Sequence, residues 1–290
     1  MSTKVRQTHR PATRPRPAPT RPGRRLLPWR LLAASALALA ALVTAVSLLT
    51  AARDAPRPAP APALTATVAT IDGQAVPVRE LNLYLVQERA ATFSHFQQKY
   101  GAADGPAFWT TSHNGQTPAA YLKKHALADV TEATVRLRLA QRYGLLADSS
   151  YAAFLAGWRS ENARRVKAVA AHQVIYGPVQ YTEPNYFTYI LGNIDFDLAE
   201  KLSRTGVIKT PDSALRAYYT AHRSEFQLGH HTSSTTRGTG VRTLTFAEAR
   251  KQVAQAYVSD QYQAMLADLV RTAKVKVAAS VLAAVPVDRA

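Results

Sequence analysis

The chain has 290 residues, of which 47% are hydrophobic, so it can bury a real core and is not disordered as a whole. Its formal charge of +17 is unevenly spread: nine Lys and Arg, and no acidic residue, lie in residues 1–30, which leaves +8 for the rest. A nucleic-acid partner is therefore not predicted. The absence of cysteine excludes disulfides, thiol nucleophiles, cysteine metal sites and a lipid-modified N-terminal cysteine.

The N-terminal part of the chain predicts a membrane anchor. Residues 1–30 are rich in proline and arginine and are expected to be a disordered basic tail. Residues 31–52 hold no charged side chain and would be about 33 Å long as a helix, which matches the hydrocarbon core of a bilayer. The excess of positive charge before this segment places the N-terminus in the cytoplasm. The prediction is a single-pass protein of the cell membrane with its main domain outside the cytoplasm.

Two readings of this anchor remain open. An uncleaved transmembrane helix fits the length of residues 31–52, whereas the small residues Thr50, Ala51 and Ala52 would also suit removal of a signal peptide. In both cases the rest of the chain is exported. Residues 53–65 are rich in proline and are expected to be a semi-rigid linker between the membrane and a domain at 66–278.

The first elements of that domain follow from turn and cap signals. Residues 66–78 alternate in polarity around Asp72-Gly73, which is typical of a two-residue β-hairpin. A helix is expected from 78 to 100, ended by Gly101, because its apolar residues recur at helical spacing. A second helix should begin after Thr117-Pro118 and end at Gly144.

Three further helices are expected in the middle of the chain. The third starts at Ser149 or Ser150 and runs to about Ala171; the fourth runs from Thr182 toward Arg204. The fifth starts at Thr210-Pro211 and ends near Phe226.

The C-terminal part combines a loop, a long helix and β-prone sequence. Residues 227–240 are polar and lack periodicity, which predicts a flexible loop, and 241–246 should include a short strand. Thr245 and Glu248 form a capping-box pattern for a helix over 246–272. Residues 274–287 are β-prone, and 279–290 are expected to be a C-terminal tail. The fold class is therefore mostly α, with a small sheet built from the entry hairpin and a closing strand.

Three segments carry a resemblance to the SurA/PrsA-type extracytoplasmic chaperones, the parvulin-type foldases. VATIDGQAVPVREL (68–81) looks like the opening hairpin and first helix of that family, in which a Glu-apolar pair, here Glu80-Leu81, begins the helix. TPDSALRAYYTAHRSEF (210–226) resembles a family helix that ends in phenylalanine. LTFAEARKQVAQAYVSDQYQAMLADLVRTAKVKV (244–277) resembles the long C-terminal helix and its closing strand. The resemblance implies a helical SurA-N-like chaperone domain over most of residues 66–278.

The chain differs from that family in the place of the isomerase domain, and this difference affects the expected function. Its isomerase domain sits between the phenylalanine-ended helix and the C-terminal helix, where this chain has only residues 227–242. An isomerase domain needs on the order of ninety residues, and folds below about 40 residues rarely stand alone. The catalytic domain is therefore expected to be absent, and the chain is not expected to be an enzyme.

Aromatic residues supply the candidate binding site. They crowd between residues 176 and 196, where an exposed groove could hold extended apolar segments of unfolded polypeptide. Burial in the core is the structural alternative for the same side chains. The candidates are Tyr176, Tyr181, Tyr186, Phe187, Tyr189 and Phe196.

Polar clusters do not predict catalysis or a cofactor. His222, His230 and His231 lack the three or four placed ligands of a zinc site and are interpreted as solvated. Asp195, Asp197 and Glu200 are interpreted as a solvated helix face, since nothing in their pattern separates their pKa values. No nucleophile elbow or phosphate loop is present. No metal and no cofactor are predicted.

Three functions follow in order. The first is a membrane-anchored holdase for unfolded or newly exported polypeptides, without prolyl isomerase activity. The second is a dedicated interaction subunit that holds one folded partner in an envelope or secretion complex. The third is a degenerate peptidyl-prolyl isomerase.

Overall fold

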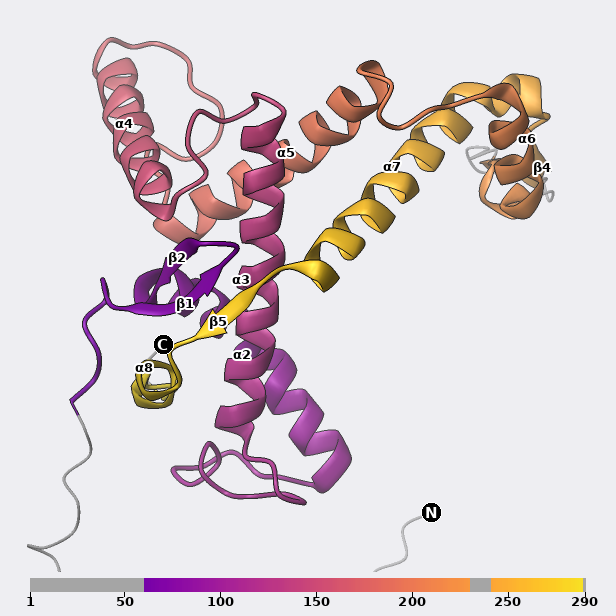
Figure 1. The fold of residues 1–290 in the computed structure, drawn as a ribbon. Coiled ribbons are helices and arrows are strands. Elements are labelled where there is room, and N and C mark those ends of the chain that lie inside the picture. The colour runs from indigo at the N-terminus through magenta and orange to yellow at the C-terminus, as the bar shows by residue number, and fades with distance from the viewer. Residues whose placement is uncertain (1–59, 230–240, 289–290) are drawn as a thin grey trace, which may run out of the picture. The chain divides into compact units, whose positions relative to one another are not determined.

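A three-stranded sheet joins the two ends of the folded part. The computed structural model describes residues 60–229 and 241–288. Strands β1 (Thr67–Ile71) and β2 (Gln74–Pro77) pair antiparallel, and β5 (Val275–Val277) pairs with the other edge of β1, so that Ala69 faces Val277. Figure 1 shows β5 returning beside β1 after the whole intervening chain. The predicted sheet of an entry hairpin and a closing strand is confirmed.

The hairpin turn explains part of this closure. Asp72 and Gly73 both have positive φ angles, 47° and 88°, as a type I′ turn requires, and the missing Cβ of Gly73 makes this conformation easy. The Asp72 backbone N–H donates to the Lys274 carbonyl oxygen at 3.0 Å, and its carboxylate accepts from the Lys274 N–H at 2.8 Å. The turn therefore also fixes the chain where β5 begins.

Helices α2 and α3 form a long antiparallel pair against the sheet. Helix α2 (Val78–Tyr100) ends at Gly101, which is left-handed with φ of 65°, and α3 (Pro118–Arg142) starts after the Thr117 cap, whose hydroxyl accepts from the Ala120 N–H. Both boundaries were predicted, because cap residues satisfy the free backbone groups at helix ends.

Helices α4 (Tyr151–Ala170) and α5 (Glu183–Arg204) follow, with Ser150 and Thr182 as N-caps, as the sequence predicted. Glu183 ties these helices to α2: its carboxylate accepts from the Arg79 guanidinium and from the Tyr151 hydroxyl. Burying apolar side chains of the sheet and of α2, α3, α5 and α7 builds the main hydrophobic core.

A second, smaller core lies around the first half of α7 (Phe246–Thr272). α6 (Asp212–Ala221) also contributes to it, as do Phe226, between the 3₁₀ turn η1 (Arg223–Glu225) and strand β3 (Gln227–Gly229), and Leu244, which follows the strand β4 (Val241–Thr243) that pairs with β3. Its buried side chains are Leu215, Phe226, Leu244, Ala249 and Val253. The last part of α7 continues into the main core through Val258, Tyr262 and Leu266. One helix thus belongs to both cores.

Several predicted boundaries need correction. The fifth helix ends at Ala221, and the 3₁₀ turn carries the chain on to Phe226. Residues 227–229, expected within a flexible loop, form β3, because β4 offers them a partner strand. Residues 230–240 lie outside the described residues. The capping box of Thr245 and Glu248 at the start of α7 is confirmed.

The prediction of a tail at residues 279–290 was wrong. Ala279–Ala284 form the short helix α8 instead of continuing the β-prone stretch or trailing as a tail. Val285 and Val287 then enter the main core, where the Arg89 guanidinium donates to the Val287 carbonyl oxygen. Apolar burial thus extends the folded unit beyond residue 278.

The predicted tail at 1–30 and transmembrane helix at 31–52 lie outside the described residues, as do residues 53–59 of the linker. The last linker residues already belong to the folded part, since the Leu64 carbonyl accepts from the Arg79 N–H. Within the described ranges, none of the helices combines the length and the apolar character needed to cross a bilayer.

Candidate functional site

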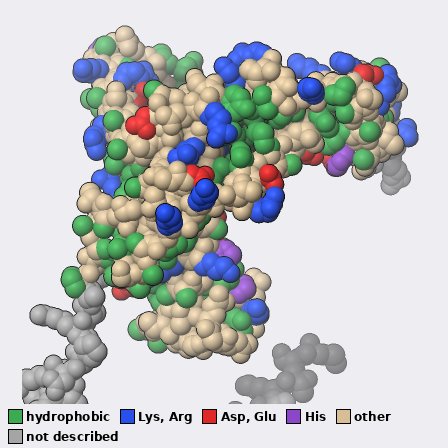
Figure 2. Space-filling model, viewed as in Figure 1, with side chains coloured by type: hydrophobic (Ala, Val, Ile, Leu, Met, Phe, Trp, Pro, Cys, Tyr) green, Lys and Arg blue, Asp and Glu red, His purple; other side chains and the backbone are tan. Residues whose placement is uncertain are grey.

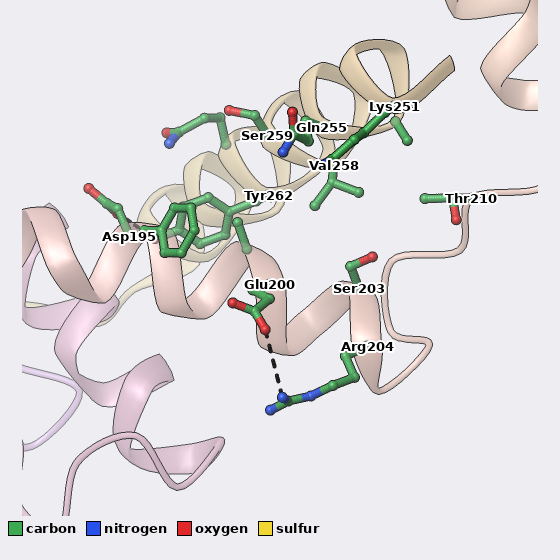
Figure 3. Close-up of a pocket in the computed structure, with 14 residues that line it drawn as sticks. Asp195, Glu200, Ser203, Arg204, Thr210, Lys251, Gln255, Val258, Ser259 and Tyr262 are labelled. Carbon is green, nitrogen blue, oxygen red and sulfur yellow. Dashed lines mark hydrogen bonds and ion pairs between the residues drawn. The ribbon is translucent and has the colours of Figure 1, made fainter. Parts of the chain in front are cut away.

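A groove runs between α5 and α7. Its volume is about 580 Å³, and hydrophobic side chains gather where these two helices run beside each other (Figure 2). The α5–α7 groove is lined by Asp195, Phe196, Ala199, Glu200, Ser203, Arg204, Thr210, Lys251, Ala254, Gln255, Val258, Ser259, Tyr262 and Gln263. Ten of these residues are labelled in Figure 3.

The phase of α5 determines which side chains face the groove. Ile194, Leu198 and Leu202 recur every four residues and are buried in the main core. Phe196 projects from another side of the helix and is 70% exposed, which is unusual for a phenylalanine. Small residues on both helices, such as Ala199 and Ala254, leave the space that forms the groove.

A hydrogen-bonded carboxylate fixes one end of the groove. The buried Tyr262 hydroxyl donates to Asp195 Oδ1 at 2.6 Å, and Arg136 Nε of α3 lies 3.0 Å from the same oxygen. Burial, together with this hydrogen bond, raises the pKa of Tyr262, which therefore remains a neutral donor. Asp195 thus joins α3, α5 and α7 at this end of the groove.

The other end carries exposed charge. Glu200 and Arg204, one turn apart on α5, form an ion pair at 3.7 Å, drawn as a dashed line in Figure 3. Lys251 lies across on α7. The ten residues of helix from Asp195 to Arg204 extend about 14 Å, which is room for roughly four residues of extended peptide. The groove therefore offers an apolar floor with polar and charged edges.

The structure separates the six aromatic candidates. Phe196 lies in the α5–α7 groove. Phe187 is only 2% exposed and packs edge-on against Tyr84 and Phe154, so it is a core residue and not a groove residue. Tyr186 is nearly buried and stacks on Phe154. The core alternative therefore applies to two of the six.

Tyr176, Tyr181 and Tyr189 lie together at a different place. With Arg164 and Arg165 they line a second hollow of about 520 Å³ at the end of α4. The rings of Tyr181 and Tyr189 stack with centroids 5.6 Å apart, and the Arg165 guanidinium lies 4.5 Å from the centroid of the Tyr181 ring. The six candidates therefore do not form one continuous groove.

Sequence reasoning missed the α7 wall. Lys251, Ala254, Val258 and Tyr262 recur at spacings of three and four and lie on one face of α7. The same pattern also describes a helix packed in a core, and the first half of α7 is in fact packed against α6. The available signal was weak: Ala254 on that face, and Ala199 and Ser203 on α5, are the small side chains that leave space for the groove.

The side chains that could ligate a metal ion are, among the described residues, those of His, Asp and Glu. In residues 60–229 and 241–288, no three His, Asp or Glu side chains are grouped as they would need to be around a metal ion. His222 contacts Glu225 at 3.0 Å. His230 and His231 fall in the part of the chain that is not described.

Comparison with known proteins gives a distant similarity to a curated protein. No family model matches the chain, and no solved structure matches it. A curated protein named "Chaperone for lacto-N-biosidase", from Bifidobacterium longum subsp. longum, is 24% identical over 138 residues. The match covers 48% of this chain and 49% of that protein, so the chain spans about half the length of the curated relative it matches. This distant similarity supports the predicted chaperone role. It does not support the SurA/PrsA type specifically.

Proposed function

We propose that this protein is a membrane-anchored, extracytoplasmic chaperone that binds non-native polypeptide in the α5–α7 groove, without catalysing prolyl isomerisation. The observation that carries the proposal is the exposed Phe196 ring that lines this groove. The similarity to a protein named as a chaperone supports it.

The chemistry of the groove suits an unfolded client. Non-native chains expose apolar side chains together with unpaired backbone groups. The Phe196 ring and Val258 supply contact area, and the Gln255 and Ser259 side chains can exchange hydrogen bonds with a peptide backbone. Binding of this kind lowers the concentration of free, aggregation-prone chain by mass action. No chemical step is needed.

The location of the protein is part of the same proposal. The uncharged segment at 31–52 and the basic residues before it are the basis for an anchor with the N-terminus in the cytoplasm. Protease treatment of intact cells tests this, since an exported domain would be digested without lysis. Digestion only after lysis would contradict the location.

A second candidate is a chaperone dedicated to one partner. The name of the curated relative specifies a single client enzyme, which favours this narrower role. Aggregation of several unrelated denatured proteins distinguishes the two candidates. Protection of most of them supports the general holdase, whereas protection of none, with one partner bound at a fixed stoichiometry, supports the dedicated chaperone.

Replacing Phe196 with serine is expected to weaken binding of an unfolded client about tenfold, because roughly 1.5 kcal/mol of apolar contact would be lost. Titration of a permanently unfolded, fluorescently labelled protein with the full-length chain measures this. The stability of the fold should remain unchanged, since the ring is largely exposed.

The matched control is Val86→Ser on α2, which removes another exposed apolar side chain far from the groove residues in sequence. Equal losses of affinity in both variants, or none in either, would contradict the groove as the client site. Robust turnover in a prolyl isomerisation assay would contradict the non-enzymatic part of the proposal.

A further inference from the structure

The loop between α4 and α5 displays apolar side chains to solvent. In residues 171–182, Val174 is 83% and Tyr176 is 87% exposed, and Val179 is also exposed. Val166 and Val169 on the last turns of α4 are exposed as well. A patch of this kind on a soluble surface indicates an interaction site.

The backbone of this loop is fixed by a buried arginine. Arg165 is 7% exposed and donates through Nη1 to the carbonyl oxygens of Tyr176 at 2.9 Å and Pro178 at 2.8 Å. Its Nη2 donates to the Tyr181 hydroxyl at 3.2 Å, and its Nε donates to Glu161 at 2.8 Å. One side chain therefore holds the loop from within while the apolar side chains remain outside.

A second set of bonds fixes the end of the loop. The Asn162 amide both donates to the Tyr181 carbonyl oxygen at 2.9 Å and accepts from the Tyr181 N–H at 2.8 Å. The Trp158 indole N–H donates to the same carbonyl at 2.8 Å. Because the loop is ordered before any partner arrives, binding through it loses little conformational entropy.

The segment formed by the end of α4 and the following loop carries an excess of positive charge. Residues 159–182 contain four Lys and Arg, namely Arg159, Arg164, Arg165 and Lys167, and one acidic residue, Glu161. Glu161 is itself paired with Arg164 and Arg165. Figure 2 shows Lys and Arg side chains over the region that α4 occupies. The apolar loop therefore stands beside positive charge that acidic residues of its own segment do not balance.

We propose that this loop, with α4, docks onto the headgroup region of an anionic lipid bilayer. Val174, Tyr176 and Val179 would enter the interface, where aliphatic side chains are buried and a tyrosine keeps its hydroxyl in the polar layer. Arg159 and Lys167 would contact the lipid headgroups. A uniformly negative surface suits this charge pattern better than a protein surface, on which both signs are interspersed.

This docking surface is distinct from the α5–α7 groove and does not depend on the client-binding proposal. It would orient the groove relative to the membrane from which exported chains emerge. It also differs from the segment at 31–52, because it concerns side chains on the surface of the folded part.

The absence of cysteine allows a direct test. Tyr176→Cys in the full-length chain, labelled with a polarity-sensitive fluorophore, reports the environment of the loop alone. The labelled protein is reconstituted in vesicles of phosphatidylglycerol or of phosphatidylcholine, so that any anchoring by other segments is the same in both. A blue-shifted emission in the anionic vesicles only, reversed by high salt, is the expected result.

Two further positions make the result interpretable. Val174→Cys should behave like the label at 176, and Val86→Cys on α2 should give the same emission in both lipids. A second readout keeps the label at position 174: adding Tyr176→Ser should reduce the blue shift in the anionic vesicles. The same emission in both lipids at 174 and 176 would overturn the proposal, as would a shift that requires an added protein partner.

Discussion

Replacing Glu80 with glutamine is expected to stabilise the protein increasingly as the pH rises from 4.5 to 8. Glu80 lies in the first turn of α2 but is 1% exposed, and within the described part of the chain its Oε2 atom has no hydrogen-bond partner. A helix N-terminus favours a carboxylate, but here the loss of hydration outweighs that effect and raises the pKa of Glu80 to about 8.

The sign of the pH dependence follows from the proton balance. Between pH 4.5 and 8 the unfolded chain has lost this proton while the folded chain retains it, so stability falls as the pH rises. At pH 7 the buried Glu80 carboxyl lowers the free energy of unfolding by about 3 kcal/mol, and above pH 8 this loss no longer grows. The glutamine amide does not titrate, so the variant lacks this loss.

Urea unfolding at pH 5, 6, 7 and 8 measures the difference between wild type and Glu80→Gln. The difference should be smallest at pH 5 and should increase by about 3 kcal/mol toward pH 7 to 8. Asp104→Asn, which removes an exposed carboxylate, is the matched control. If Asp104→Asn changed the pH dependence of stability as much as Glu80→Gln does, the role of the buried carboxyl would be refuted.

Replacing Phe96 with alanine is expected to lower the free energy of unfolding by about 3–5 kcal/mol. Phe96 is fully buried in an aromatic cluster at the end of the α2–α3 pair. Its ring centroid lies 5.5 Å from that of Tyr121, in an edge-on arrangement, and 6.3 Å from that of Phe108. Truncation would lose these contacts and leave a cavity that rigid rings fill poorly.

Thermal and urea unfolding provide the measurement, with Phe93→Ala as the control. Phe93 lies one turn earlier on α2, contacts Phe108 and is only partly buried, so its truncation should cost clearly less. Below its melting temperature, Phe96→Ala should still bind unfolded client, because the α5–α7 groove contains no member of the cluster. Loss of client binding by the folded variant would show that the cluster belongs to the client site.

Local signals in the sequence were sufficient for most helix boundaries. Thr117-Pro118, Ser150, Thr182 and the pair of Thr245 and Glu248 are caps whose side chains bond to backbone within three residues. Such bonds depend on neighbouring residues and not on the rest of the fold. The hairpin at Asp72-Gly73 is equally local.

The errors arose where distant parts of the chain decide the structure. Residues 279–284 hold one β-branched residue, Val281, together with alanines, a composition that does not by itself decide between strand and helix. The helix forms where the following Val285 and Val287 pack into the core. Gln227–Gly229 became a strand because β4 lies opposite. In both cases tertiary contacts override weak local preference.

The candidate site could be predicted only in part. Counting aromatic residues selected Phe196 and Phe187 alike, although one lies in the groove and the other in the core. Their helical phase distinguishes them: Phe187, Ile194 and Leu198 follow the buried stripe of α5, whereas Phe196 does not. The α7 wall could not be assigned, because it requires knowing that α7 runs beside α5.

The pairing of Ala69 with Val277 has a consequence for how the protein is made. Until residue 277 has left the ribosome, β1 keeps an open edge, and the main core lacks the last turns of α7. Contacts across 200 residues slow folding and leave early segments unprotected while they wait. A protein synthesised from the N-terminus would therefore close its sheet only when β5 arrives, and complete its main core only when Val285 and Val287 follow.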